Sequence, residues 1–363
     1  MSVSRELLIQ HVEGKPGKVY YPLIIRESPV PTPAAGEVLV RYKAAALNHR
    51  DLFIRQSLYP GIDFNKALLA DGYGVVVSVG SGVSRVKVGD PVIAAPMRGW
   101  ASDPVGPEGS EFHVSGGTKA SDSGTGRDYG LLSEDDVEPA PAHLTAVEAA
   151  ALPLVGLTGW RALVTKSGAA APGKNILVTG IGGGVALIVL QLAVAHGANV
   201  YVTSGSPDKL ERAKQLGAKG GVSYKSDTWE KELKAQLPKD RPFLDAIIDG
   251  AGGAIVSKGV KLLRTGGVIS QYGMTVGPKM DWLMSAVLAN IDLRGVTMGS
   301  RQEFRDMLKF VGEHKIKPVI SKTVKGLDNL DAIEGLFNDM HEGKQFGKLV
   351  IEIDSAVDTP SRL

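Results

Sequence analysis

Residues 174–206 read KNILVTGIGGGVALIVLQLAVAHGANVYVTSGS. They open with an apolar run, Ile176–Val178, which is typical of a strand buried on both faces. A glycine-rich turn follows, and the almost continuously apolar run from Val185 to Ala195 predicts a deeply packed helix that ends before Gly197. A second strand is predicted over Asn199–Thr203. Together they form a βαβ unit whose helix N-terminus presents free backbone N–H groups.

The spacing of small residues in the glycine turn favours a dinucleotide ligand. The strict pattern G-x-G-x-x-G is absent, but Gly180-x-x-Gly183-x-x-Ala186 places a small residue wherever helix and strand must approach. A glycine cluster alone is also compatible with an ordinary tight turn. The flanking strands and the long apolar helix make a dinucleotide site the better interpretation.

The end of the second strand bears on which dinucleotide binds. An acidic residue there would hold a ribose 2′-hydroxyl, but residues 203–206 read Thr-Ser-Gly-Ser, and Lys209 follows one helical turn later. Hydroxyls and an ammonium suit a 2′-phosphate. The nearest acid, Asp208, is expected in the first turn of the next helix, where it favours the helix dipole. The sequence therefore predicts NADP(H) rather than NAD(H).

The composition limits the classes of function. A chain of 363 residues is long enough for two domains. Its net charge of +2 and the lack of a long basic run give no support for nucleic-acid binding. The absence of cysteine excludes disulfides, thiol nucleophiles and cysteine-ligated zinc. Neither a signal-peptide core nor an apolar run of membrane-spanning length occurs, so we expect a soluble intracellular protein without a membrane partner.

Residues 1 to about 95 are expected to be β-rich. The segment 37–43 alternates like a half-buried strand, 74–79 reads as a second strand, and glycines and prolines separate such runs. This density of short strands suggests a barrel-like fold. The segment 96–130 is rich in Gly, Ser and Asp, which predicts a surface loop.

Strands and helices then alternate in the middle of the chain. Before them, Thr145 lies three residues ahead of Glu148, the spacing of a capping box that begins a helix. Six strands are predicted, over residues 176–179, 199–203, 221–224, 244–249, 267–272 and 291–296. With helices between most of them, they indicate a doubly wound α/β sheet.

The C-terminal part breaks this alternation. We predict a helix over Gln302–His314, a strand at 318–320, a helix over Leu330–His341 and a closing strand over Leu349–Ile353. Because these elements continue neither the pattern nor its spacing, we expect them to pack back on the N-terminal domain.

Several separate motifs match one family in order and spacing. They are Asn48-His49-Arg50-Asp51, the run Ala70–Val76, the run Val88–Val92, Ala150–Pro153 with Gly156–Thr158, the glycine turn, and Gln345–Lys348. The chain thereby resembles the medium-chain dehydrogenase/reductase superfamily, specifically its zinc-free quinone oxidoreductase-like branch. The resemblance implies an α/β protein with a β-rich GroES-like barrel domain over residues 1–147 and 300–363. It also implies a doubly wound Rossmann domain over 148–299 with a six-stranded parallel sheet.

The same comparison with the family argues against a metal. Zinc-dependent members bind zinc through a Cys, a His and Glu in a G-H-E motif, and a later Cys or Asp. Here Asn48 stands in place of the first Cys, and residues 69–71 read Leu-Ala-Asp. His49 and Asp51 remain, but they do not make a tetrahedral site with an open position. We expect no metal, and hydrogen-bond donors must then polarise the substrate oxygen.

The resemblance implies two catalytic residues. An Asn at the place of Asn48 lies near the nicotinamide and the substrate in this family, and a Tyr at the place of Tyr59 lines the substrate cleft. A tyrosine can donate a hydrogen bond or a proton at neutral pH. Tyr59 is equally well interpreted as a packing residue. A second family tyrosine corresponds to Phe53, a departure from any two-tyrosine mechanism.

The cofactor implied is NADPH. The residues expected to bind it are Asn48, Thr158, Gly182, Gly183, Gly184, Val185, Ser204, Gly205, Ser206, Lys209, Tyr224 and Tyr272. Lys209 is alternatively a solvated surface charge. Asp245 and Asp249 flank a buried strand, and we expect them to serve turns or caps rather than acid–base chemistry.

The predicted function is NADPH-dependent hydride transfer to quinones or α,β-unsaturated carbonyl compounds without zinc. One alternative is a zinc-free oxidoreductase of ketones or alcohols. Another is a cofactor-binding protein with a structural or regulatory role, as in crystallin-like relatives. The expected partners are a small electron-poor carbonyl or quinone substrate and a second copy of the chain. The homodimer would form by pairing of the edge strand Ile291–Val296.

The C-terminal tripeptide Ser361-Arg362-Leu363 is a close relative of the S-K-L peroxisomal signal. Asp354 and Asp358 upstream are not the basic context that would strengthen it. We expect a peroxisomal protein, with a cytoplasmic location as the alternative.

Overall fold

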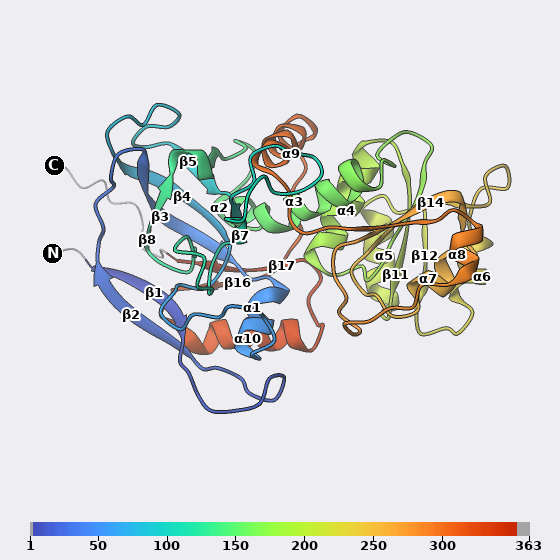
Figure 1. Ribbon diagram of the computed structural model, residues 1–363, viewed down its shortest axis with the longest axis horizontal. Helices are drawn as coiled ribbons and strands as arrows, with labels where there is room; N and C mark the ends of the chain where they lie inside the picture. The colour runs from blue at the N-terminus through green and yellow to red at the C-terminus, as the bar shows by residue number, and fades with distance from the viewer. Residues whose placement is uncertain (1–2, 354–363) are drawn as a thin grey trace. The chain divides into compact units, whose positions relative to one another are not determined.

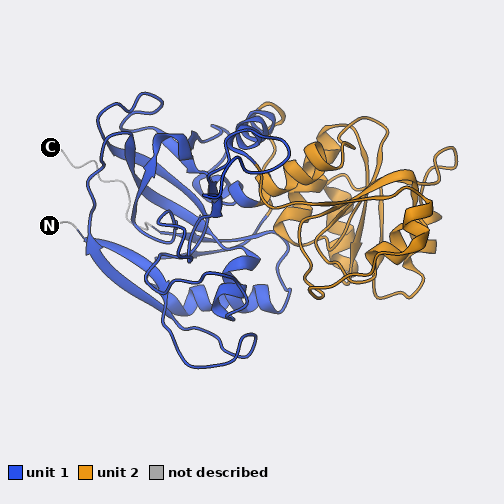
Figure 2. Cartoon of the chain, in the orientation of Figure 1, with its two compact units in different colours: residues 1–154, 300–312, 320–363 blue, residues 155–299, 313–319 orange. Residues whose placement is uncertain are grey.

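The computed structural model of the chain describes residues 3–353. The tripeptide Ser361-Arg362-Leu363 lies outside these residues, so the expected location stays a prediction. The chain divides into two compact units, which Figure 2 distinguishes by colour. Unit 1 comprises residues 1–154, 300–312 and 320–363, and unit 2 comprises 155–299 and 313–319. Residues 148–154 were expected in the Rossmann domain but belong to unit 1. Residues 313–319 were expected in the GroES-like domain but belong to unit 2.

Unit 2 is built on a six-stranded parallel sheet with the strand order β12-β11-β10-β13-β14-β15. The strands are β10 (Asn175–Val178), β11 (Asn199–Ser204), β12 (Gly220–Ser223), β13 (Leu244–Asp249), β14 (Leu263–Gln271) and β15 (Asp292–Gly295). From the central β10 the chain adds β11 and β12 on one side, then crosses to β13 and the rest on the other. This is the order of a doubly wound dinucleotide fold. The predicted α/β class with six parallel strands is confirmed.

Helix α4 (Gly184–Ala195) follows the glycine turn as predicted. Its side chains are apolar almost all round, and residues 187–190 are all buried. The helix is capped by His196, and Gly197 follows. The φ of Gly197, +79°, is the left-handed conformation expected of a glycine just past a helix end. The other helices of residues 153–299 are α3 (Pro153–Trp160), α5 (Pro207–Gln215), α6 (Trp229–Lys234), α7 (Ile255–Gly259) and α8 (Met284–Leu288), with a π-helical turn over Arg161–Lys166.

Unit 1 contains a seven-stranded, mostly antiparallel sheet. Its strand order is β16-β17-β3-β4-β5-β9, and β8 also pairs with β3. These strands are β3 (Glu37–Ala46), β4 (Asp71–Val79), β5 (Pro91–Ala94), β8 (Tyr129–Ser133), β9 (Val137–Pro139), β16 (Ile320–Lys325) and β17 (Lys348–Glu352). Two smaller sheets pair β1 (Val3–Ile9) with β2 (Leu23–Pro29) and β6 (Met97–Arg98) with β7 (His113–Val114). The expectation of a β-rich first domain is therefore correct.

The α-helices that accompany these sheets are α1 (His49–Arg55), α2 (Ala146–Ala150), α9 (Arg301–His314) and α10 (Leu330–His341), with a 3₁₀ turn over Glu134–Asp136. The predicted capping box begins α2. The Thr145 hydroxyl accepts from Glu148 N at 3.3 Å, and the Glu148 carboxylate accepts from Thr145 N at 2.8 Å. Within residues 3–353, no helix combines the length and the apolar character needed to cross a bilayer.

The C-terminal segment returns to the N-terminal strands, as predicted (Figure 1). Strand β17 pairs antiparallel with β3, with Val350 opposite Ala46. The strand expected at 318–320 is misplaced, because β16 begins only at Ile320. The ring nitrogen of Pro318 carries no hydrogen and cannot donate to the strand ladder.

The segment 96–130 is not the plain surface loop that its composition predicted. Its buried polar residues include Ser115, Ser121, Ser123 and Thr125. Their hydroxyl groups have internal partners, since Ser123 Oγ donates to Ser115 Oγ at 2.9 Å and Thr125 Oγ1 donates to Asp71 O at 2.8 Å. Buried hydroxyls that bond one another or the backbone avoid the cost of desolvation. A polar composition therefore did not imply exposure here.

Candidate functional site

The register of the large sheet in unit 1 brings three distant residues together. Strand β3 ends at Ala46, two residues before Asn48, and the antiparallel pairing places Ala46 opposite Asp71, the first residue of β4. On its other side Ala46 faces Val350, two residues after Lys348. Because β4 and β17 both run opposite to β3, their first residues lie at the end of β3. We call this group the Asn48 cluster: Asn48, Asp71 and Lys348.

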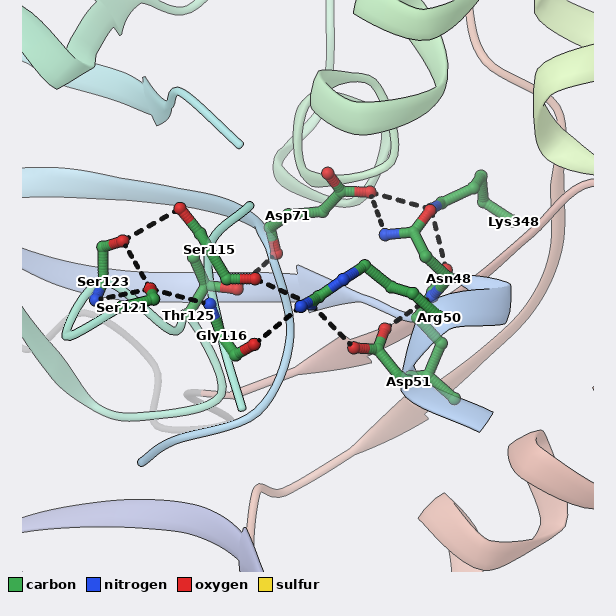
Figure 3. A network of polar contacts seen from close by, with 11 residues as sticks. Asn48, Arg50, Asp51, Asp71, Ser115, Gly116, Ser121, Ser123, Thr125 and Lys348 are labelled. Carbon is green, nitrogen blue, oxygen red and sulfur yellow. Dashed lines mark hydrogen bonds and ion pairs between the residues drawn. The ribbon is translucent and has the colours of Figure 1, made fainter. Parts of the chain in front are cut away.

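The Asn48 cluster is buried and closely hydrogen-bonded (Figure 3). Lys348 Nζ donates to Leu47 O at 2.7 Å, Asn48 Oδ1 at 2.6 Å and Asp71 Oδ2 at 2.8 Å. Asn48 Nδ2 donates to the same Asp71 Oδ2 at 2.9 Å. The other Asp71 oxygen, Oδ1, accepts from Leu154 N at 2.7 Å. All three ammonium hydrogens thus have an acceptor, and the charge of Asp71 balances that of Lys348.

Asn48 also begins helix α1. Its backbone is extended, with φ of −132°, and its N–H donates to the Asp51 carboxylate at 2.8 Å. This is the reach-back half of a capping box, which holds the start of the helix. Burial raises the pKa of Asp51 to about 6. Burial, and secondarily the Lys348 charge, lowers the pKa of His49, so its imidazole is neutral at pH 7.

The residues of the Asn48 cluster do not fit zinc. Asn48 and Asp71 stand where zinc-dependent relatives of the predicted family have ligands, but the Lys348 ammonium contacts both of them. A cation at hydrogen-bond distance from both side chains competes with a metal for the same oxygens. Among residues 3–353, no three His, Asp or Glu side chains are grouped in a way that would hold a metal ion.

Arg50 connects Tyr59 to the same region. Its guanidinium donates to Ser115 O at 2.7 Å and to Gly116 O at 2.9 Å, and its Nη1 lies 3.5 Å from the Asp51 carboxylate. The Arg50 Cζ atom lies 4.7 Å from the centre of the Tyr59 ring, a cation–π contact. Tyr59 is half-buried and also packs against the apolar core of unit 1. Both expectations for Tyr59, packing and proton donation, are compatible with this setting.

The glycine turn in unit 2 has the features of an anion site. Gly182 has φ of +130°, which side chains rarely adopt, and Gly183 is the N-cap of α4 without a side chain to cap it. The N–H groups of Gly184 and Val185 belong to the first turn, where no intrahelical acceptor exists. The Lys209 side chain passes over the turn, since a Cβ at Gly182 would lie 3.2 Å from Lys209 Nζ. The free N–H groups of the turn can hold a pyrophosphate.

The predicted 2′-phosphate residues gather at the end of β11. Ser204 is buried, and its Oγ accepts from Ser206 N at 3.2 Å. A Cβ at Gly205 would lie 2.6 Å from the Tyr224 hydroxyl and 3.1 Å from Lys225 Cε. Glycine is therefore needed at 205 for this approach. Lys225 was not predicted for the site, although it directly follows Tyr224.

Thr158 and Tyr272, the residues expected near the nicotinamide, are held within unit 2. Thr158 is buried in α3, with its Oγ1 3.7 Å from Met298 Sδ. Tyr272 is half-buried with its ring against Gly250, and burial, followed by the nearby Asp249 charge, raises the pKa of its phenol. Tyr272 is consequently protonated at neutral pH and remains a hydrogen-bond donor.

Asp249 serves a turn, as expected, whereas Asp245 bonds to a neighbouring strand and to basic side chains. Asp249 closes the turn after β13 by accepting from Gly252 N and from Gln271 Nε2, both at 2.6 Å. Asp245 accepts from Asn175 N at 2.9 Å. It also forms ion pairs with Lys174, Arg241 and Arg264.

The predicted site residues thus form two sets. Asn48 and Tyr59 belong to unit 1, and the other cofactor residues belong to unit 2. Within unit 1, sequence reasoning missed Asp71 and Lys348 as partners of Asn48, although both lie in motifs that carried the family resemblance. The missing information was the strand register, which no local pattern supplies.

Two family descriptions match the chain. The description "Alcohol dehydrogenase GroES-like domain" matches residues 34–142, and "Zinc-binding dehydrogenase" matches residues 184–313. A Leptosphaeria maculans protein named zinc-type alcohol dehydrogenase-like protein YogA is 56% identical over 354 residues, which cover 96% of this chain and 99% of that protein. The chain belongs to the medium-chain dehydrogenase/reductase superfamily.

Other members of the superfamily are similar over most of their length. The quinone oxidoreductase of Mus musculus is 27% identical, with 89% of this chain and 91% of that protein covered. A solved structure of an NAD-dependent alcohol dehydrogenase has a TM-score of 0.81 at 32% identity and covers 96% of this chain and 100% of its own. This member is therefore an oxidoreductase with the GroES-like and Rossmann domains that the resemblance implied.

Removing one charge from the Asn48 cluster should destabilise unit 1. We expect Asp71→Asn to lower the free energy of unfolding by about 3–5 kcal/mol, because it leaves the buried Lys348 ammonium without a counter-ion. Adding Lys348→Met should recover a large part of that loss. Urea denaturation of the single and double variants measures both effects.

The exposed pair Lys322–Asp339, at 3.0 Å in the same unit, is the control. Asp339→Asn should cost less than about 1 kcal/mol. Simple addition of the Asp71 and Lys348 effects would show that the buried charges are not coupled.

Proposed function

We propose that this oxidoreductase reduces quinones or α,β-unsaturated carbonyl compounds with NADPH and without zinc. The observation that carries the proposal is the Lys348 ammonium, which contacts both Asn48 and Asp71 at the places of metal ligands. A chain that replaces a Lewis acid by amide and ammonium groups is suited to substrates that need little polarisation. Conjugated C=C bonds meet that condition, since the negative charge that develops is delocalised into an enolate.

Bound NADPH would supply the hydride. The chain's own task is to hold the carbonyl oxygen and to provide a proton. Asn48 is the donor we assign to that oxygen, because its amide retains one N–H that the Asn48 cluster does not use. Tyr59 or water would supply the proton. Tyr59 is kept in place by Arg50, whose guanidinium is itself fixed by two backbone carbonyl groups.

A second candidate is oxidoreduction of saturated ketones or alcohols. The relatives named alcohol dehydrogenase favour it, and the mouse relative named quinone oxidoreductase favours the first proposal. Binding of cofactor without turnover, in a structural or regulatory role, is the third. Residues 3–353 hold no group of side chains suited to zinc, which weighs toward the first, since saturated carbonyl groups need stronger polarisation.

A panel of acceptors tests these alternatives. We expect NADPH oxidation with a quinone and an enone to exceed that with a saturated ketone by at least about tenfold in kcat/KM, roughly 1.4 kcal/mol of transition-state stabilisation. Prior dialysis against a zinc chelator should leave the rate unchanged. Equal rates with the saturated ketone, or loss of activity that zinc restores, would contradict the proposal.

The preference for NADPH rests on the end of β11. No carboxylate lies there to accept from a ribose 2′-hydroxyl, while Ser206, Tyr224 and the Lys209 and Lys225 side chains surround Gly205 and the glycine turn. This grouping is cationic and rich in hydroxyl groups, as a 2′-phosphate requires. The relative named NAD-dependent makes NADH the alternative cofactor.

Lys209→Ala should distinguish the two cofactors. Loss of a charge-assisted contact worth about 1.5–3 kcal/mol would weaken NADPH binding roughly tenfold to a hundredfold and leave NADH binding nearly unchanged. Lys214→Ala is the control, because Lys214 lies on the same helix and pairs with Glu211 at 2.7 Å. Calorimetric titration gives both dissociation constants. An equal loss for the two cofactors would remove Lys209 from the 2′-phosphate site.

We also propose that two copies of the chain associate through the edge of the unit 2 sheet. All residues of the edge strand β15 are exposed in the single chain. Nearby in sequence, Met284 and Leu288 of α8 are 66% and 73% exposed, and exposed apolar side chains grouped in this way are typical of an interaction surface. Pairing of β15 with its two-fold copy would satisfy the exposed backbone groups.

The charged double variant Met284→Glu with Leu288→Glu should shift the protein from dimer to monomer in light scattering at micromolar concentration. Val105→Glu is the control, since Val105 is also highly exposed but belongs to unit 1. A monomeric mass for the unaltered protein would contradict the proposed dimer.

A further inference from the structure

The side chain of Asn48 is held at both ends of its amide group (Figure 3). Oδ1 accepts from the Lys348 ammonium at 2.6 Å, and Nδ2 donates to the Asp71 carboxylate at 2.9 Å. An asparagine amide carries two N–H donors and one carbonyl acceptor. One donor therefore remains for a ligand, while the oxygen already accepts from a cation.

The two charges determine which way the amide faces. Rotation of the amide by 180° would place the NH₂ group against the ammonium and the carbonyl oxygen against the carboxylate. Both new contacts would be repulsive, and the low dielectric of a buried site strengthens them. An asparagine between neutral neighbours would have no such preference.

We propose that Lys348 is a positioning residue for Asn48. Its ammonium, bound to Leu47 O, Asn48 Oδ1 and Asp71 Oδ2, holds the amide so that an N–H, and not the carbonyl oxygen, is available to the substrate. The inference rests on the proposed function, because it assigns that N–H to the carbonyl oxygen of the quinone or enone. It adds that the lysine of the C-terminal strand β17 acts on the reaction through Asn48.

A purely structural role explains the contacts less completely. A buried ion pair is weak support for stability, because well-packed apolar side chains often serve equally well. Asp71 has a separate backbone partner in Leu154 N. Lys348, in contrast, makes two of its three hydrogen bonds to residues 47–48, the segment that carries the proposed donor.

The lack of cysteine allows the lysine to be removed and restored chemically. Lys348→Cys would be the only thiol in the chain. Alkylation in denaturant with 2-bromoethylamine, followed by refolding, yields an aminoethyl side chain of nearly the same length and charge as lysine. Alkylation with bromoethane yields the matched side chain without the ammonium. The unaltered protein is taken through the same cycle.

We expect kcat for the quinone or enone to fall roughly tenfold to a hundredfold in the ethylated form, since a misplaced group typically costs this much. The aminoethylated form should recover most of the rate, and the Kd of NADPH should change by less than about twofold in both. Lys322→Cys, at an exposed lysine of β16, is the control and should keep its rate after either alkylation. Equal kcat in the ethylated and aminoethylated forms would overturn the proposal.

A second readout does not depend on activity. In protein labelled with ¹⁵N-asparagine, the side-chain amide signal of Asn48 is identified by its loss in Asn48→Ala. It should shift in the ethylated form and return in the aminoethylated form. An amide signal that does not respond to the ammonium would overturn the positioning role. A responsive amide in a protein that reduces no acceptor would support positioning and refute the proposed function instead.

The double variant Lys348→Met with Asp71→Asn provides the same test if Lys348→Cys does not refold after alkylation. It leaves no lone buried charge and retains an acceptor for Leu154 N. We expect it to fold, to show a shifted Asn48 amide signal and to lose kcat as the ethylated form does. A normal kcat together with an altered amide signal would overturn the link between positioning and catalysis.

Discussion

The burial of one ammonium group constrains the centre of unit 1. Lys348 carries its charge into the end of a β-sheet, where an unpaired cation would be very costly. Three oxygens compensate for it, from Leu47 and Asn48, which directly follow β3, and from Asp71 at the start of β4. The antiparallel register of β17, β3 and β4 must therefore be kept, because a shift of one residue would turn these side chains to the opposite face. Sheet pairing and site chemistry depend on each other here.

This dependence gives the Asn48 cluster a fixed charge around which it is organised. The Lys348 ammonium draws together an amide, a carboxylate and a backbone carbonyl from separate segments, as a metal ion draws together its ligands. The lysine differs from zinc in chemistry as well as in origin. It is part of the chain and cannot dissociate as a metal ion can. It acts on oxygen only through hydrogen bonds, so the proposed reaction is one that needs little polarisation of the substrate oxygen.

Local patterns were sufficient to predict the Rossmann domain but not the Asn48 cluster. The glycine turn, the apolar helix and Gly197 are contiguous, and each signals its structure through the residues beside it. The partners of Asn48 lie 23 and 300 residues away and meet it only through strand pairing. The prediction for segment 96–130 failed for a related reason: its buried hydroxyl groups bond to one another and to the backbone, so their polarity did not lead to exposure.

The insertion of unit 2 within unit 1 has a consequence for synthesis on the ribosome. The six strands of unit 2 end at residue 295, whereas β17 begins only at Lys348. The Rossmann sheet can form while β3 still lacks its neighbour β17 and Asp71 still lacks its counter-ion Lys348. Completion of the first domain thus waits for the last part of the chain, and a truncated nascent product would contain an intact nucleotide fold beside an unfinished barrel.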